Sequence, residues 1–112
     1  MATAEGLLVH NVFFLLHDRS PAAKNDLVAA CRKYLPGHAG IVFFGCGVLA
    51  EELNREVNVR DFDVALHIVF KDQAAHDHYQ ETAAHHQFIA ENKANWKQVR
   101  VFDSVAGQSP TP

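Results

Sequence analysis

The sequence lacks several features that would place it in a special class of protein. No apolar run comes close to the ~20 residues that a membrane-spanning helix needs, and the 10 Lys and Arg residues do not outnumber the 13 Asp and Glu residues. We therefore expect no membrane insertion. Nucleic acid is not an expected partner either, because phosphate binding normally needs a basic patch. The first ten residues have no basic segment and no cleavage pattern, so no secretory signal is expected.

Cysteine is also scarce. Cys31 and Cys46 are the two cysteines of the chain, and their spacing fits neither a metal site nor a redox pair. Buried, reduced thiols in a cytoplasmic protein are the simplest interpretation. Neither cysteine has an activating neighbour in the sequence, so a cysteine nucleophile is not expected.

The chain nevertheless has enough apolar material for one core. It has 112 residues, of which 48% are hydrophobic and 21% charged. This length and composition are typical of a single domain. We predict one domain over residues 1–106, followed by a flexible tail over residues 107–112.

The order of the predicted elements indicates the fold. Strands are expected at 7–16, 41–49, 62–70 and 96–105, and helices at 21–35, at 72–81 and from Thr82 to about residue 95. Ser20 and Pro21 are suited to start the first helix, and Pro36 and Gly37 to end it. The resulting order, β-α-β-β-α-β, predicts an α+β ferredoxin-like fold. In that fold both helical regions cover one face of a four-stranded antiparallel sheet.

The strands predict that a second surface covers the sheet. LLVHNVFFLL and IVFFGCGVL are apolar at both odd and even positions, whereas a sheet with one wet face alternates apolar and polar residues. Because the helices cover only one face, the other would leave a large apolar patch that soluble monomers rarely tolerate. We therefore predict a homodimer through the sheet face, a dimeric α/β barrel, with Val12 or Val101 facing the partner.

The stretch HYQETAAHHQF, residues 78–88, contains the main candidate site. Tyr79 and His85 are six residues apart, so they would not share a face of one continuous helix. A break with Thr82 as the N-cap would instead place His85 in a new first turn, where the helix dipole disfavours imidazolium. A neutral His85 could act as a general base or accept a hydrogen bond from Tyr79. From the residues alone, an acid–base pair and an ordinary packing pair both remain open.

Five other histidines have more ordinary interpretations. His10 lies in the middle of a predicted strand, as a core residue or in a pocket, and His67 is interpreted as mainly structural, facing either the core or the dimer interface. His76 and His78 diverge on their helix, and His86 is expected to face solvent. No group of residues has zinc-ligand spacing, so neither a metal nor a cofactor is expected.

The chain also resembles a known family through five segments in the same order. These are LVHNVFFLL, LPGHAGI, FDVALHIVF, Tyr79-x5-His85-x2-Phe88 and VRVFD. Together they are similar to the stress-responsive A/B barrel (Dabb) family of dimeric α/β barrels over about residues 7–105. Most of that family has no assigned activity. One member, olivetolic acid cyclase, closes a polyketide ring by aldol condensation.

The resemblance implies a site between the helices and the sheet. Tyr79 and His85 match the acid–base pair of the cyclase, and His10 matches a histidine that lines its pocket. Phe14 and Phe88 are expected to bind ligand in the same pocket.

Two departures from the cyclase argue against the same substrate. Val64 stands where the cyclase has a further histidine, and Thr82-Ala83 stands where the cyclase has a His-Pro pair. The general geometry of the site is therefore expected to persist while the substrate differs.

Three functions remain open at this point. The first is a homodimer that binds a small apolar or aromatic molecule and has no assigned activity. The second is a cofactor-free polyketide cyclase or aldol-type lyase that uses His85 and Tyr79. The third, a cofactor-free monooxygenase, depends on fold analogy alone. A cleft of ~300 Å³ or more with the polar groups converging on it would favour an enzyme.

Overall fold

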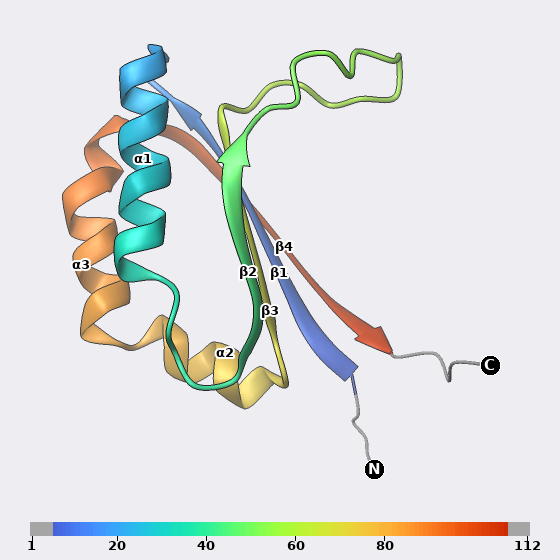
Figure 1. Cartoon of the computed structure of the whole chain (residues 1–112), viewed down its shortest axis with the longest axis vertical. Coiled ribbons are helices and arrows are strands. Elements are labelled where there is room, and N and C mark those ends of the chain that lie inside the picture. The colour runs from blue at the N-terminus through green and yellow to red at the C-terminus, as the bar shows by residue number, and fades with distance from the viewer. Residues whose placement is uncertain (1–5, 108–112) are drawn as a thin grey trace.

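The computed structural model describes residues 6–107, which form a four-stranded sheet with helices packed on it (Figure 1). In chain order the elements are β1 (Gly6–Leu16), α1 (Pro21–Tyr34), β2 (Ile41–Val48), β3 (Val64–Phe70), α2 (Gln73–Gln80), α3 (Ala83–Asn92), the 3-10 helix η1 (Lys93–Asn95) and β4 (Trp96–Gly107). The strand order is β2-β3-β1-β4, and all neighbouring pairs are antiparallel. The predicted ferredoxin-like fold is thus confirmed.

Most predicted boundaries agree with the structure, and β4 is the main exception. It continues to Gly107, so residue 107 belongs to the sheet and not to the predicted tail. Ladder pairing explains the difference, because Ala106 and Gly107 lie opposite Leu7 and Gly6 of β1. Residues 108–112 of the predicted tail, and the first five residues of the predicted domain, lie outside the described residues. No helix within 6–107 is long and apolar enough to cross a membrane.

The helix ends follow local signals in the sequence. The Ser20 side chain caps α1 by accepting a hydrogen bond from the backbone N–H of Ala23, and Pro21 is the first helical residue. After α1, Gly37 adopts a positive φ of 87°, a conformation that glycine adopts without steric cost. The predicted break at Thr82 is also confirmed, because α2 ends at Gln80 and α3 begins at Ala83.

The core lies between the helices and one face of the sheet (Figure 1). Alternate residues of β1 point toward the helices and are buried, namely Leu8, His10, Val12, Phe14 and Leu16. Ile68 and Phe70 of β3 and Leu27 of α1 complete the centre of this core. His10 is the polar member of the β1 row, so the fold places an imidazole directly under the helices.

A buried carboxylate joins the start of β3 to β1 and α1. Asp63 is 1% exposed, and its Oδ2 accepts a hydrogen bond of 2.9 Å from the backbone N–H of Leu16. Arg19 Nε lies 3.1 Å from both carboxylate oxygens, and Lys24 Nζ lies 3.7 Å from Oδ1. The charge of Asp63 is therefore paired, as a buried carboxylate requires.

Within residues 6–107, no helix covers the opposite face of the sheet (Figure 1). Phe13 of β1 and Phe102 of β4 lie on this face with their ring centroids 5.8 Å apart, and Phe43 of β2 is 56% exposed there. His67 also faces this side, where its Nδ1 lies 2.7 Å from Asn11 Oδ1. We call these five residues the open face.

Val12 and Val101 do not belong to the open face. They are register partners on β1 and β4, and Val12 is buried beneath the helices. The expectation that it faces a partner copy was therefore wrong for Val12, whereas Val101 is 50% exposed on the helix side of the sheet. Both faces of these strands are apolar, so the sequence pattern could not distinguish the helix side from the open side.

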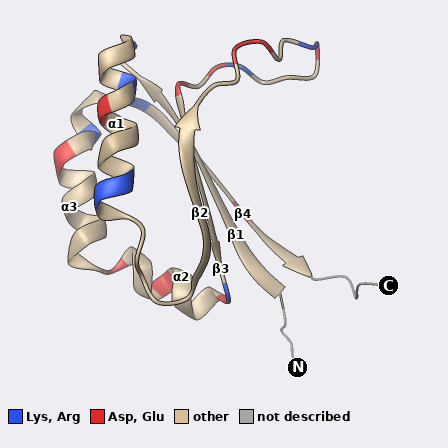
Figure 2. Cartoon of the chain, viewed as in Figure 1, with Lys and Arg blue, Asp and Glu red and all other residues tan. Residues whose placement is uncertain are grey.

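Most charged side chains lie away from the sheet, although Lys97, Arg100 and Asp103 are on β4. Figure 2 shows Lys, Arg, Asp and Glu mainly on the helices and on the long loop between β2 and β3. That loop extends away from the sheet (Figure 1) and exposes Leu53, Val57 and Val59. The sheet is thus presented to its surroundings as a largely uncharged surface.

Candidate functional site

A cavity of about 170 Å³ lies between the helices and the sheet, and its walls are mostly apolar. Its lining residues are His10, Val12, Phe14, Leu66, Tyr79, Gln80, His85, Phe88, Ile89, Trp96, Val99 and Val101. All the site residues that the sequence predicted are in this set. The structure thus brings together His10 and Phe14 from β1, Tyr79 from α2, and His85 and Phe88 from α3.

The break between α2 and α3 brings Tyr79 and His85 together. Thr82 Oγ1 accepts a hydrogen bond of 3.2 Å from the backbone N–H of His85, which starts α3 in a new direction. The ring centroids of Tyr79 and His85 are consequently 4.8 Å apart, with an angle of 68° between the ring planes. The two side chains therefore face the same cavity although they belong to different helices.

A histidine that the sequence analysis did not single out supports this break. His38 Nδ1 lies 2.9 Å from the carbonyl oxygen of Leu35, and its Nε2 lies 2.9 Å from Thr82 Oγ1. Because a carbonyl oxygen only accepts, Nδ1 of His38 donates to Leu35. The single hydrogen of the Thr82 hydroxyl lies within reach of both His38 Nε2 and the carbonyl oxygen of Tyr79. The His38 ring also lies against Tyr79, with centroids 5.1 Å apart. His38 belongs to the LPGHAGI segment, which was the only available signal for it.

His85 is neutral at physiological pH. Burial, followed by the neighbouring His86 and then His10, His38 and His76, lowers the pKa of His85 from 6.5 to about 4. Its Nδ1 is buried and has no hydrogen-bond partner within the described part of the chain. An unpartnered buried polar atom is rare in a native protein, so this nitrogen is available to a molecule in the cavity.

Tyr79 and His10 supply two further polar groups of the cavity, beside those of Gln80 and Trp96. Tyr79 is 1% exposed, and burial raises the pKa of its hydroxyl, which therefore remains protonated. His10 Nδ1 lies 2.5 Å from Asp103 Oδ1, across the β1–β4 ladder. Burial lowers the pKa of His10, while the bond to Asp103 acts in the opposite direction. The sequence analysis missed Asp103, because no pattern in the chain connects it to His10.

The remaining candidate histidines lie outside this cavity. His78 and His86 are exposed, as His86 was expected to be. His76 is partly buried, and its ring centroid is 5.0 Å from that of His10. Of the eight histidines, therefore, His10 and His85 line the cavity and the other six do not.

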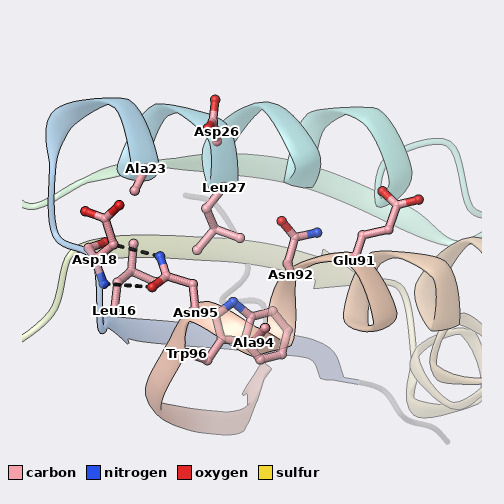
Figure 3. A pocket seen from close by; sticks show the side chains of 10 residues that line it. All are labelled: Leu16, Asp18, Ala23, Asp26, Leu27, Glu91, Asn92, Ala94, Asn95 and Trp96. Carbon is pink, nitrogen blue, oxygen red and sulfur yellow. Dashed lines mark hydrogen bonds between the residues drawn. The ribbon is translucent and has the colours of Figure 1, made fainter.

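A larger cleft of about 360 Å³ lies between α1 and the segment that joins α3 to β4 (Figure 3). Asn95 bridges its end through hydrogen bonds to the backbone of Asp18, and Asp26 and Glu91 lie along its edge. Trp96 lines both this cleft and the cavity. The cleft is lined by carboxylates and by no histidine, so among the described residues the pairing of histidine with tyrosine is found in the smaller cavity.

The two cysteines do not form a reactive site. Both are free, and Cys31 is buried whereas Cys46 is partly buried. Burial raises the pKa of Cys31 to about 12 and also raises the pKa of Cys46. Their thiolate forms are therefore disfavoured.

Comparison with known proteins gives one family and a set of similar folds. The model of the family described as Stress responsive A/B Barrel Domain matches residues 8–106. No curated protein matches the sequence.

Three solved structures illustrate the similarity of fold. A Dabb family protein with a ferredoxin-like fold from Mesorhizobium loti is 20% identical, with a TM-score of 0.74 over 90% of this chain and 97% of the other. A dimeric ferredoxin-like protein of unknown function from Thermobifida fusca is 12% identical, with a TM-score of 0.73 over 94% of this chain and 95% of the other. The hydroxynitrile lyase from Passiflora edulis is 14% identical, with a TM-score of 0.74 over 96% of this chain and 100% of the other.

Proposed function

This chain belongs to the stress-responsive A/B barrel domain family, and we propose that it is a homodimer in which each copy binds a small apolar or aromatic molecule between its helices and its sheet. The observation that carries this proposal is the unpartnered Nδ1 atom of His85 in a mostly apolar cavity. Apolar walls with a few convergent polar groups are typical of small-molecule sites.

The size of the cavity limits the ligand. A volume of about 170 Å³ is below the ~300 Å³ that drug-sized ligands usually occupy. A single aromatic ring or a short branched chain is the appropriate scale. Phe14 and Phe88 would pack against the apolar part of such a ligand, and His85 would hydrogen-bond its polar group.

The open face supports the homodimer. Phe43 and Phe102 are both more than half exposed there, and a further cavity of about 380 Å³ is lined by Phe13, Phe102 and the loop residue Val59, among others. A second copy, packed sheet against sheet, would cover this apolar surface and fill that cavity. The dimeric description of the Thermobifida fusca protein agrees with such an assembly.

A cytoplasmic location is part of the same proposal. Cys31 and Cys46 are free thiols, and reducing compartments keep thiols in that state.

The second candidate function is a cofactor-free lyase or cyclase that acts on a carbonyl compound. It is favoured by the pairing of a neutral His85 with a protonated Tyr79, whose ring centroids are 4.8 Å apart. His85 would take a proton from the carbon next to the carbonyl, and the Tyr79 hydroxyl would donate a hydrogen bond to the enolate oxygen. The enolate carbon would then form a bond to a second carbonyl carbon, whose oxygen takes up the proton.

A thermal-shift screen of small aromatic and polyketide-like compounds tests the binding proposal. The variants are His85→Ala and Tyr79→Phe, with His86→Ala as the matched control because His86 is exposed outside the cavity. We expect a ligand at 100 times its Kd to stabilise wild type and control by about 2.7 kcal/mol, and His85→Ala by much less. Equal stabilisation of all variants would place the ligand elsewhere and contradict the proposal.

The same variants separate the enzyme from the binding protein. If the pair is catalytic, each substitution should lower the turnover of a discovered substrate by ~10²–10⁴ while the fold and the dimer persist. If both variants instead lose about 1–3 kcal/mol of stability and bind the same ligands, Tyr79 and His85 have a structural role.

A further inference from the structure

Three potential metal ligands converge next to the helix–sheet cavity, and one of them, His10, lines it. His10 comes from β1, His76 from α2 and Asp103 from β4. One ligand atom of each lies within 4.8 Å of the others. They are far apart in the sequence, which explains why spacing alone predicted no metal site.

The neighbours of His76 leave the lone pair of one ring nitrogen, Nε2, available to a cation. Its Nδ1 lies 3.1 Å from the carboxylate oxygen Oδ1 of Asp77, so Nδ1 carries the proton and donates it. The lone pair is then on Nε2, where the amide nitrogen of Gln80 lies at 3.4 Å, in the position of a weak donor. A histidine whose other nitrogen is held by a carboxylate is the usual arrangement of a metal-binding imidazole.

His10 and Asp103 complete the set on the sheet side. His10 Nδ1 and Asp103 Oδ1 are 2.5 Å apart. Because a carboxylate oxygen only accepts, His10 Nδ1 donates the proton of the hydrogen bond that they share. The side chain of His10 is 5% exposed whereas that of Asp103 is 41% exposed. The carboxylate therefore has room to turn, and a cation arriving from solvent could take the place of the proton of that hydrogen bond.

We propose that His10, His76 and Asp103 form a binding site for a first-row divalent cation, with Zn²⁺ as the best match. Two imidazoles and one carboxylate suit zinc and its neighbours, while Mg²⁺ and Ca²⁺ prefer sites made of oxygen ligands. Zinc bonds of about 2.0–2.2 Å place ligand atoms roughly 3.3–3.6 Å apart, so small side-chain rotations would bring the three atoms into range.

The position of the site gives the cation an open side. His10 and Gln80, which contacts His76 Nε2, both line the cavity that contains His85 and Tyr79. With three protein ligands, a zinc ion retains a coordination position for water or another small ligand. We place this open coordination position on the cavity side. A molecule in the cavity could therefore bind the cation through an anionic or carbonyl oxygen. The metal site does not depend on the ligand proposed above, because the cation itself is the probe.

Titration of chelator-stripped protein with Zn²⁺, followed by calorimetry, tests the site. We expect one Zn²⁺ per chain with a tight dissociation constant. His76→Gln and Asp103→Asn should each weaken binding by at least about tenfold, the lower end of the effect of disturbing a metal site. His78→Gln is the matched control, because His78 is an exposed histidine on the same helix, and its affinity should equal that of wild type.

Two results would overturn the proposal. The first is the absence of a tight site in the wild type. The second is an equal loss of affinity in His78→Gln and His76→Gln, which would indicate adventitious binding by surface histidines. Circular dichroism checks the fold of each variant. If His76→Gln does not fold, Asp77→Asn replaces it, since Asp77 is exposed and only orients His76, and an unchanged affinity in that variant also contradicts the proposal.

Discussion

The aromatic rings of Tyr79 and His85 lie 4.8 Å apart, although the two residues belong to successive helices with different directions. A continuous helix would have placed them on different faces. The relationship therefore depends on the two residues between α2 and α3, Glu81 and Thr82, and in particular on the side chain of Thr82. Loss of that side chain should affect both the stability of α3 and the geometry of the cavity.

Thr82→Ala should reduce the free energy of unfolding by about 1 kcal/mol, the usual effect of removing an N-cap side chain. The hydrogen bond from the His85 backbone and the contact with His38 are both lost. Urea denaturation measures the change. Thr82→Ser keeps the hydroxyl and is the control, so a loss of the same size in Thr82→Ser would show that the hydroxyl is not what stabilises the break.

The free energy of unfolding should depend on pH through the protonation of His85. Its pKa is lowered from 6.5 to about 4 in the folded protein, so between these values the unfolded chain binds the extra proton. Stability should therefore fall as the pH decreases from about 6.5 to about 4. Thermal unfolding of wild type and His85→Gln across this range measures the effect. The stability of the variant should change less steeply with pH than that of wild type. His10, whose pKa is also lowered, contributes to the slope in both proteins, so identical slopes in the two proteins would contradict the assignment to His85.

Phe102→Asp should dissociate the proposed homodimer. Phe102 is 55% exposed on the open face next to Phe13, and a carboxylate there would be buried without a partner in a sheet-to-sheet interface. Analytical ultracentrifugation at micromolar concentration measures the change. Ala22→Asp is the control, because it adds the same charge on the exposed first turn of α1, where the helix dipole favours it. A wild-type protein that sediments as a monomer would refute the homodimer.

Asp63→Ala should lower the free energy of unfolding by about 1–3 kcal/mol, because the backbone N–H of Leu16 would lose a buried acceptor. Asp63→Asn keeps an acceptor for Leu16 but removes the charge that Arg19 and Lys24 face. Comparing the two by chemical denaturation separates the hydrogen bond from the ion pairs. We expect Asp63→Asn to be the milder substitution, and an equal loss of stability in the two variants would show that the charge dominates.

The amino-acid sequence by itself determined the order of the strands and helices and most of their ends. Ser20 and Thr82 accept hydrogen bonds from the backbone three residues further along the chain, and Gly37 acts through its own positive φ. Their effects are therefore visible in a local pattern. The same is true of the meeting of Tyr79 and His85, which follows from the cap at Thr82.

Only the tertiary structure decided which face of the sheet the helices cover and which distant side chains meet. Val12 and Phe13 are neighbours with equally apolar side chains, so alternation along β1 cannot show which of them lies beneath α2 and α3 and which lies on the open face. His10 meets Asp103 through the register of β1 with β4 and meets His76 through the packing of α2. Such contacts depend on the summed packing of the whole core, and no short segment of the chain contains that information.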